Sequence, residues 1–339
     1  MRITSKGEQV YRFNQVFFQK KAHKNYKDTT DQLKKIIKSF FIFNISFFSL
    51  FFVEIISFII LFPIFDSSTL LALLLAGIFL TAFTYFVLLF YFQSKKNEQI
   101  VALKDRFIKV CKRALSIPIG SAEHHLTIAL ASLKLSENLS KLENIIPKIL
   151  LFTKKISSFF LKQDIFKFKE LLLTAAIDEH LEQLKLTPTD LEVHASLANI
   201  YTNLSSLYLN AKTNVFFSNI AQSHLNQKYE ACITSNLEEF KILNDYAPND
   251  PWIHLQLAMS YNKLNLKKEQ IKEYEIIYKL CPNDNNVLFK LGALYFETKR
   301  NSKGLRIYEE LLMRSFKDAS KLLTYYGAYK TQEIFSEPV

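Results

Sequence analysis

Two stretches near the C-terminal end decide the fold: PNDPWIHLQLAMSY at residues 248–261 and PNDNNVLFKLGALY at residues 282–295. The second begins 34 residues after the first, and both open on Pro-Asn-Asp. A leucine, a small residue and a tyrosine then recur in register, as Leu257, Ala258 and Tyr261 and as Leu291, Gly292 and Tyr295. Self-similarity at a fixed period of this length is typical of stacked supersecondary units. The chain therefore contains an internal repeat.

Each repeat predicts a helix with a defined start. Asp250 precedes Pro251, which places an N-cap side chain before a proline at the first helical position. Asp284 is expected to cap the matching helix of the next unit. Pro188-Thr189-Asp190 opens an earlier copy, with Leu197, Ala198 and Tyr201 at the matched positions. This copy lies 60 residues before the next one, which predicts an insertion at about 207–232.

The period and the residue pattern resemble the tetratricopeptide repeat, a helix-turn-helix unit that stacks into a solenoid. The resemblance implies an all-α fold in which residues 164–316 form an α-solenoid, with Asp164 capping its first long helix and residues 317–339 forming a capping helix or tail. It also implies a concave groove that binds a protein or peptide. Carried over by alignment, the groove residues are Asn199, Asn203, Trp252, Leu255, Met259, Asn262, Lys263, Phe289, Lys290 and Phe296.

Two apolar stretches earlier in the chain predict a transmembrane hairpin over residues 39–93. Residues 40–62 and 70–92 are each longer than the ~20 residues that a helix needs to cross the hydrocarbon core. Pro63 and Asp66 lie in the break between them. Backbone groups must be paired in lipid, so two helices joined by a turn are the simplest arrangement. The alternative is a buried helix pair in the core of a soluble protein.

Three residues are expected to hold the hairpin together. Glu54 is the one ionisable residue within the apolar stretches, and such residues are costly in lipid. Reflection about the turn places Glu54 near the depth of Gly77 and close to Thr81. A small residue at each of these two positions predicts a close approach of the helices.

The net charge of +11 divides unevenly along the chain. Residues 1–38 carry +7 and residues 94–113 carry +5, whereas residues 39–93 carry −2 and residues 114–339 are close to neutral at +1. The positive charge flanks the apolar hairpin, which predicts that both termini face the cytoplasm and gives no basic stripe for nucleic acid. We expect residues 1–38 to lie at an anionic membrane surface or to form a solvated arm, and residues 94–163 to form a basic juxtamembrane and irregular helical region.

No catalytic, metal or cofactor site is predicted. The three cysteines are widely spaced without a CxxC pair, and His124-His125 lacks a third ligand at a suitable spacing. His194 and His254 occupy the same repeat position, where core packing or groove lining is expected. The sequence therefore predicts a binding protein and not an enzyme.

The leading functional hypothesis is a membrane-tethered interaction scaffold in a bacterial inner membrane. One alternative is a structural homo-oligomeric membrane protein. Another is a secreted protein of the inclusion membrane of an intracellular bacterium, whose two-lobed hairpin has the same pattern and whose partners are host factors.

Overall fold

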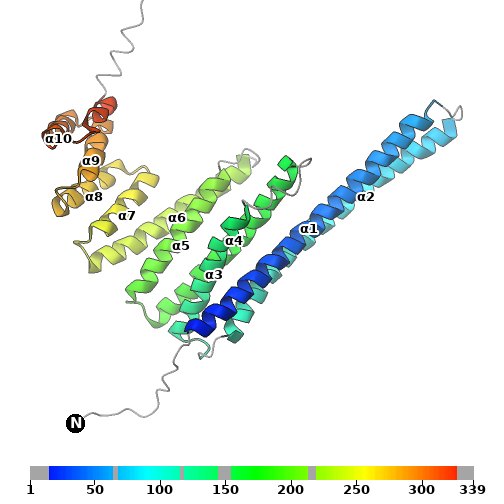
Figure 1. Cartoon of the computed structure of the whole chain (residues 1–339), viewed down its shortest axis with the longest axis horizontal. Helices are drawn as coiled ribbons and strands as arrows, with labels where there is room; N and C mark the ends of the chain where they lie inside the picture. The colour runs from blue at the N-terminus through cyan, green and yellow to red at the C-terminus, as the bar shows by residue number, and fades with distance from the viewer. Residues whose placement is uncertain (1–14, 64–67, 115–117, 144–153, 213–218, 327–339) are drawn as a thin grey trace, which may run out of the picture. The chain divides into compact units, whose positions relative to one another are not determined.

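The computed structural model describes residues 15–63, 68–114, 118–143, 154–212 and 219–326. The regular secondary structure of these ranges is entirely helical, without strands, as the scarcity of glycine and proline predicts (Figure 1). The chain forms two compact units, Met1–Pro188 and Thr189–Val339. The all-α class predicted from the sequence is confirmed for the described residues.

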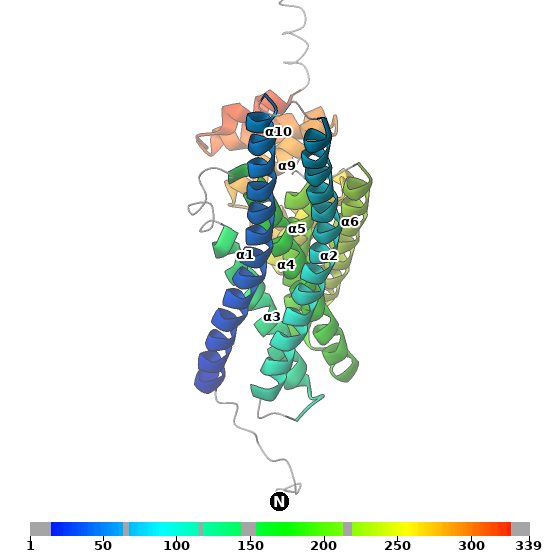
Figure 2. The same ribbon diagram turned by 90° about the vertical axis from the view of Figure 1, so that its right-hand side faces the viewer.

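Two long helices dominate the first unit. Helix α1 spans Gln15–Leu61 and helix α2 spans Ser68–Ala114, with 47 residues each, or about 70 Å at 1.5 Å per residue. They pack side by side along their length (Figure 2). Helix α1 contains residues 15–38 without a break before the apolar stretch. For this part of the chain, the basic residues therefore belong to a helix that continues into the apolar stretch, and their contact with a membrane surface or with solvent stays a prediction; residues 1–14 lie outside the described part.

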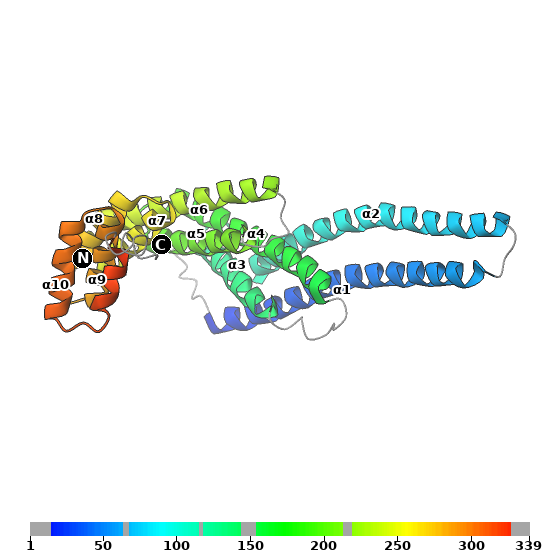
Figure 3. The same cartoon turned by 90° about the horizontal axis from the view of Figure 1, so that it is seen from above.

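Helices α3 (Ala122–Glu143) and α4 (Lys154–Leu186) pair with each other and pack against the non-apolar ends of α1 and α2. All four helices contribute to one core, which includes Leu33, Phe107, Leu135 and Phe168, each at most 1% exposed. Figure 3 shows α3 and α4 beside one end of α1 and α2, the same two helices that form the apolar hairpin. The hairpin therefore extends directly from a packed helical body.

Asp164 is not the N-cap that the sequence predicted. Helix α4 begins at Lys154, so Asp164 lies inside it, and its carboxylate oxygen Oδ1 is 2.7 Å from Nζ of Lys96 in α2. Both side chains are 6% exposed. The region 94–163 is correspondingly more regular than expected, since α2, α3 and the start of α4 account for its described residues.

The second unit is a succession of helix pairs: α5 (Leu191–Lys212) with α6 (Asn219–Tyr246), α7 (Pro251–Lys263) with α8 (Lys267–Leu280), and α9 (Asn285–Glu297) with α10 (Asn301–Met313). Each helix packs against the next in the chain. A 3-10 helix, η2 (Ala319–Tyr325), covers α9 and α10.

The helix starts and ends repeat as the sequence predicts. Asp250 accepts a hydrogen bond from the backbone N–H of Trp252 at 2.9 Å, and Asp284 accepts from that of Asn286 at 2.9 Å. After the C-terminal ends of α7 and α9, a residue with left-handed backbone conformation occupies the same repeat position: Asn265 at φ 58° and Lys299 at φ 60°. The predicted N-caps are confirmed, and the period of 34 residues is visible in the turns.

The described residues of the predicted insertion, 207–212 and 219–232, belong to the first helix pair. They lengthen this pair, because α5 has 22 residues and α6 has 28, against 13 and 14 in α7 and α8. Residues 213–218, between these two helices, lie outside the described part of the chain.

Phe296, which the sequence placed in the groove, is a core residue at 3% exposure. Its ring lies against Gly304 of α10, where a Cβ atom would be 2.5 Å from the ring carbon Cε1. The ring also packs on Tyr326 with centroids 5.3 Å apart. The groove position for Phe296 is therefore wrong, because the glycine in the facing helix leaves room for the ring inside the pair.

Candidate functional site

The apolar parts of α1 and α2 leave their side chains uncovered. Both helices are long and apolar enough to cross a membrane, and none of either apolar window is buried. The large side chains that point outward include Phe52, Phe79 and Phe83, which are 64%, 67% and 68% exposed. The alternative of a buried core pair in a soluble protein is wrong for these residues, since a core pair has its apolar side chains covered.

Polar contacts join the two helices inside the apolar region. The hydroxyl of Thr81 donates to Oε1 of Glu54 at 2.7 Å, and the hydroxyl of Tyr85 donates to Oδ1 of Asn44 at 2.9 Å. Glu54 and Thr81 are therefore brought together across the hairpin. The contact between Asn44 and Tyr85 was not predicted, although their equal distances from the turn could have indicated it.

Gly77 does not mediate the close approach that the sequence predicted. A Cβ atom built on Gly77 has no atom of the described chain within 4 Å. The space beside Gly77 is therefore open, and this glycine does not bring the two helices into close contact. The hydrogen bond to Glu54 comes from Thr81, one turn further along α2.

Histidine–glutamate pairs join the two helices of three successive helix pairs, one in the first unit and two in the second. His125 in α3, His194 in α5 and His254 in α7 each place Nδ1 against a glutamate of the following helix, at 2.6, 2.6 and 2.7 Å. The partners are Glu179 in α4, Glu239 in α6 and Glu273 in α8. Core packing or groove lining is what the sequence predicted for His194 and His254, and nothing in the sequence indicated their glutamate partners. The α3–α4 pair was not recognised as repeat-like from the sequence.

His254 contacts an oxygen atom on each side of its ring. Its Nδ1 lies 2.7 Å from Oε2 of Glu273, and its Nε2 lies 2.9 Å from the carbonyl oxygen of Pro248. The next unit replaces this pair by Leu288 and Ile307, 34 residues further along, which shows that the position is a packing site.

The predicted groove residues divide by exposure. Asn199, Trp252, Met259, Asn262 and Lys290 are exposed, whereas Asn203, Leu255, Lys263 and Phe289 are half-buried. The structure brings four of these into one stripe of α7, at positions 252, 255, 259 and 263. Residues with this spacing share one helix face. The opposite face of α7 is buried through Ile253, Leu257 and Ala258.

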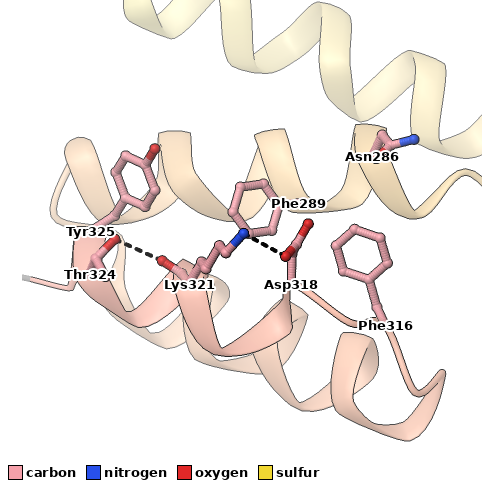
Figure 4. Close-up of a pocket in the computed structure, with 7 residues that line it drawn as sticks. All are labelled: Asn286, Phe289, Phe316, Asp318, Lys321, Thr324 and Tyr325. Carbon is pink, nitrogen blue, oxygen red and sulfur yellow. Dashed lines mark hydrogen bonds and ion pairs between the residues drawn. The ribbon is translucent and has the colours of Figure 1, made fainter.

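A pocket of about 440 Å³ lies between α9 and the C-terminal 3-10 helix (Figure 4). Phe289, Phe316 and Tyr325 form aromatic walls, with ring centroids of Phe289 6.2 and 6.4 Å from the other two. Lys321 pairs with Asp318 at 2.7 Å at the rim, where both side chains are largely exposed. The sequence indicated Phe289 but not its two aromatic neighbours, because Phe316 and Tyr325 follow the last recognisable repeat.

The described residues hold no group of three or more His, Cys, Asp or Glu side chains placed to bind a metal ion. His124, at 1% exposure, has no hydrogen-bond partner for either ring nitrogen within the described chain. Burial lowers the pKa of His124, so its imidazole is neutral at physiological pH and behaves as a packing residue.

Comparison with known proteins adds no relative: no protein-family model matches the chain, and no curated protein matches it.

Proposed function

We propose that this chain is an integral membrane protein whose hairpin anchors a helical-repeat head that binds a protein or peptide. The observation that carries the proposal is the uncovered apolar surface of α1 and α2, which continues into a packed body without a break in either helix. An exposed apolar surface of this size marks a site of membrane or protein contact, and the length of each apolar stretch favours a membrane. The basic segments on both sides of the hairpin favour an orientation with both termini on the cytoplasmic side of a bacterial inner membrane.

The repeated caps and turns of α7 and α9 favour a solenoid related to the tetratricopeptide repeat. Such a head presents the first helix of each unit on one face. The exposed side chains of Trp252, Met259 and Asn262 supply that face with apolar and polar groups suited to a peptide or a partner helix. Attachment to a bilayer would raise its effective concentration toward partners in the same membrane.

Membrane insertion is tested by flotation of the full chain with phospholipid vesicles, followed by alkaline carbonate extraction. The full chain is expected to stay with the vesicles. Phe79→Arg with Phe83→Arg should move a large fraction to the supernatant, since each arginine costs about 2.5–3.5 kcal/mol at the centre of a membrane helix. Recovery of the unaltered full chain in the carbonate supernatant would exclude the proposal.

The binding role is tested by photo-crosslinking in cells from Asn262 in the membrane-embedded protein, with the exposed residue Lys272 of α8 as the matched control site. A single recurrent heterologous partner captured from Asn262 alone supports a scaffold. Its compartment distinguishes a partner in the producing cell from a host factor, as expected for an inclusion-type membrane protein. Capture of only the chain itself supports the structural alternative.

A specific observation favours self-association as the second candidate. A Cβ atom on Gly77 would meet no other part of the described chain within 4 Å, and a glycine beside open space allows a second helix to approach closely. A membrane oligomer packed at Gly77 should dissociate in Gly77→Leu, whereas an unchanged oligomeric state in detergent would exclude this candidate.

A further inference from the structure

The outward stripe of α7 ends in a lysine for which the described chain supplies no counter-charge. Lys263 is half-buried, and no ion pair or hydrogen bond to its ammonium occurs among the described residues. Its removal from water lowers the pKa of Lys263. The carboxylate of Glu297 pairs with a different lysine, Lys267, at 3.0 Å, and Lys267 also lies 3.4 Å from Oδ1 of Asn262. A half-buried cation without a partner is a cost that a bound carboxylate would offset.

The rest of the stripe is apolar and open. Trp252 is 54% exposed although its ring packs edge-on against Phe240, with centroids 5.8 Å apart. Met259 is 47% exposed, and Leu255 lies between them. Tryptophan is enriched among residues that dominate binding energy, and methionine adapts to varied apolar partners. These side chains can hold apolar groups of a ligand, but they give no preference for charge.

We propose that the α7 face binds a peptide segment in which apolar side chains are followed by a carboxylate that pairs with Lys263. This inference rests on the proposed binding function of the head and names the chemistry of its partner. The carboxylate is an aspartate or glutamate side chain or a chain terminus. The apolar groups cover Trp252, Leu255 and Met259.

The helix sets the spacing in the ligand. Lys263 lies eleven residues beyond Trp252, or about 16 Å along the axis at 1.5 Å per residue. An extended peptide advances ~3.4 Å per residue, so the carboxylate should lie about five residues from the side chain that covers Trp252. The carboxylate should likewise lie about two residues from the ligand side chain that covers Met259.

The chain provides its own reporter, because Trp252 is its one tryptophan. We would select a displayed library of random dodecapeptides on the full chain in nanodiscs, after depletion on empty nanodiscs. Peptides selected on the wild type would be synthesised and titrated while Trp252 emission is recorded. The same selection would be run on Lys263→Gln, Lys263→Glu and, as a matched control, Lys272→Glu in α8. Thermal melts would establish that each variant folds. If Lys263→Glu does not fold, the comparison is made with Lys263→Gln.

The wild type and Lys272→Glu are expected to enrich apolar peptides with an acidic residue or a chain terminus at the predicted spacing. Replacing that acid by its amide should weaken binding about tenfold, as expected for a charge-assisted contact worth about 1.4 kcal/mol. Lys263→Gln should remove the acidic preference, and Lys263→Glu should replace it with Lys or Arg.

Each other outcome contradicts the inference in a distinguishable way. If the selected peptides have no acidic position, the carboxylate contact is contradicted. The same holds if the acidic preference persists in Lys263→Glu. In both cases the proposed binding function is not contradicted. No enriched peptide on the wild type would overturn both. Trp252 emission that changes only with the concentration of the chain itself would show that a second copy covers this face, and that would also overturn the inference.

Discussion

The ammonium of Lys96 lies 2.7 Å from the carboxylate of Asp164, and the two side chains are almost completely buried. The same ammonium lies 4.2 Å from the ring centroid of Phe40, where the first apolar stretch begins. One cation at the end of the second apolar stretch therefore contacts α1 and α4 together. This contact fastens the base of the hairpin to the helical body.

Lys96→Met is expected to destabilise the first unit by about 3–5 kcal/mol at neutral pH, because it leaves the carboxylate of Asp164 buried without a counter-charge. Lys96→Met combined with Asp164→Leu should recover most of that loss, since an apolar pair of similar volume has no charge to desolvate. Denaturant unfolding monitored by circular dichroism measures both. Equal losses in the single and double variants would contradict a coupled pair.

Asp164 should also give the first unit a defined pH dependence. Burial raises the pKa of Asp164 above its ordinary value of 3.8, against the opposing effect of Lys96. The folded state therefore binds this proton more tightly than the unfolded state. The stability that Asp164 contributes is complete below pH 3.8, and it is lost as the pH rises through the raised pKa of the folded state. In Asp164→Asn, the free energy of unfolding should not decrease over this pH range. An identical pH profile in both proteins would contradict the assignment.

The pair formed by His254 of α7 and Glu273 of α8 should behave as one packing element. His254→Leu and Glu273→Ile are each expected to cost about 1–3 kcal/mol, because each leaves a polar partner without its hydrogen bond. The double variant should lie close to the wild type, since the next helix pair carries Leu288 and Ile307 at the same positions. Thermal unfolding measures the coupling. Simple addition of the two single losses would show that the residues act independently.

The buried thiol of Cys111 should resist modification. Burial raises its pKa to about 12, although the amide of Asn25 donates to Sγ at 3.3 Å and opposes the shift. At pH 8 the thiolate fraction is then roughly three orders of magnitude below that of a free cysteine. Timed maleimide labelling with mass spectrometry should modify the half-buried Cys281 first. Equal rates at the two cysteines would contradict the packing of α1 on α2 at this depth.

Local patterns predicted most of what the structure contains. The positions of Asp250 and Asp284 fixed two helix starts, because an N-cap acts on its own first turn. Continuous apolarity predicted the hairpin, because its length matches a physical thickness. Reflection about the turn placed Glu54 near the depth of Gly77 and close to Thr81, and the hydrogen bond forms with Thr81.

Contacts between distant elements escaped prediction. Nothing near Asp164 in the sequence indicates that Lys96 faces it, so a residue of helix-capping type was mistaken for a cap. Phe296 was misplaced because its burial depends on a glycine in the following helix. The glutamates opposite the three histidines lie 19 to 54 residues away, and the intervening spacing varies between units.

The central claim is that the exposed surface of the hairpin lies in lipid. The most direct test is the depth of nitroxide labels in the full chain, reconstituted in vesicles, after Cys281→Ser. Labels at Phe52→Cys and Phe83→Cys should be accessible to oxygen and protected from a water-soluble nickel chelate, whereas a label at Lys109→Cys in the basic part of α2 should show the reverse. Nickel access at both phenylalanine positions would contradict the account.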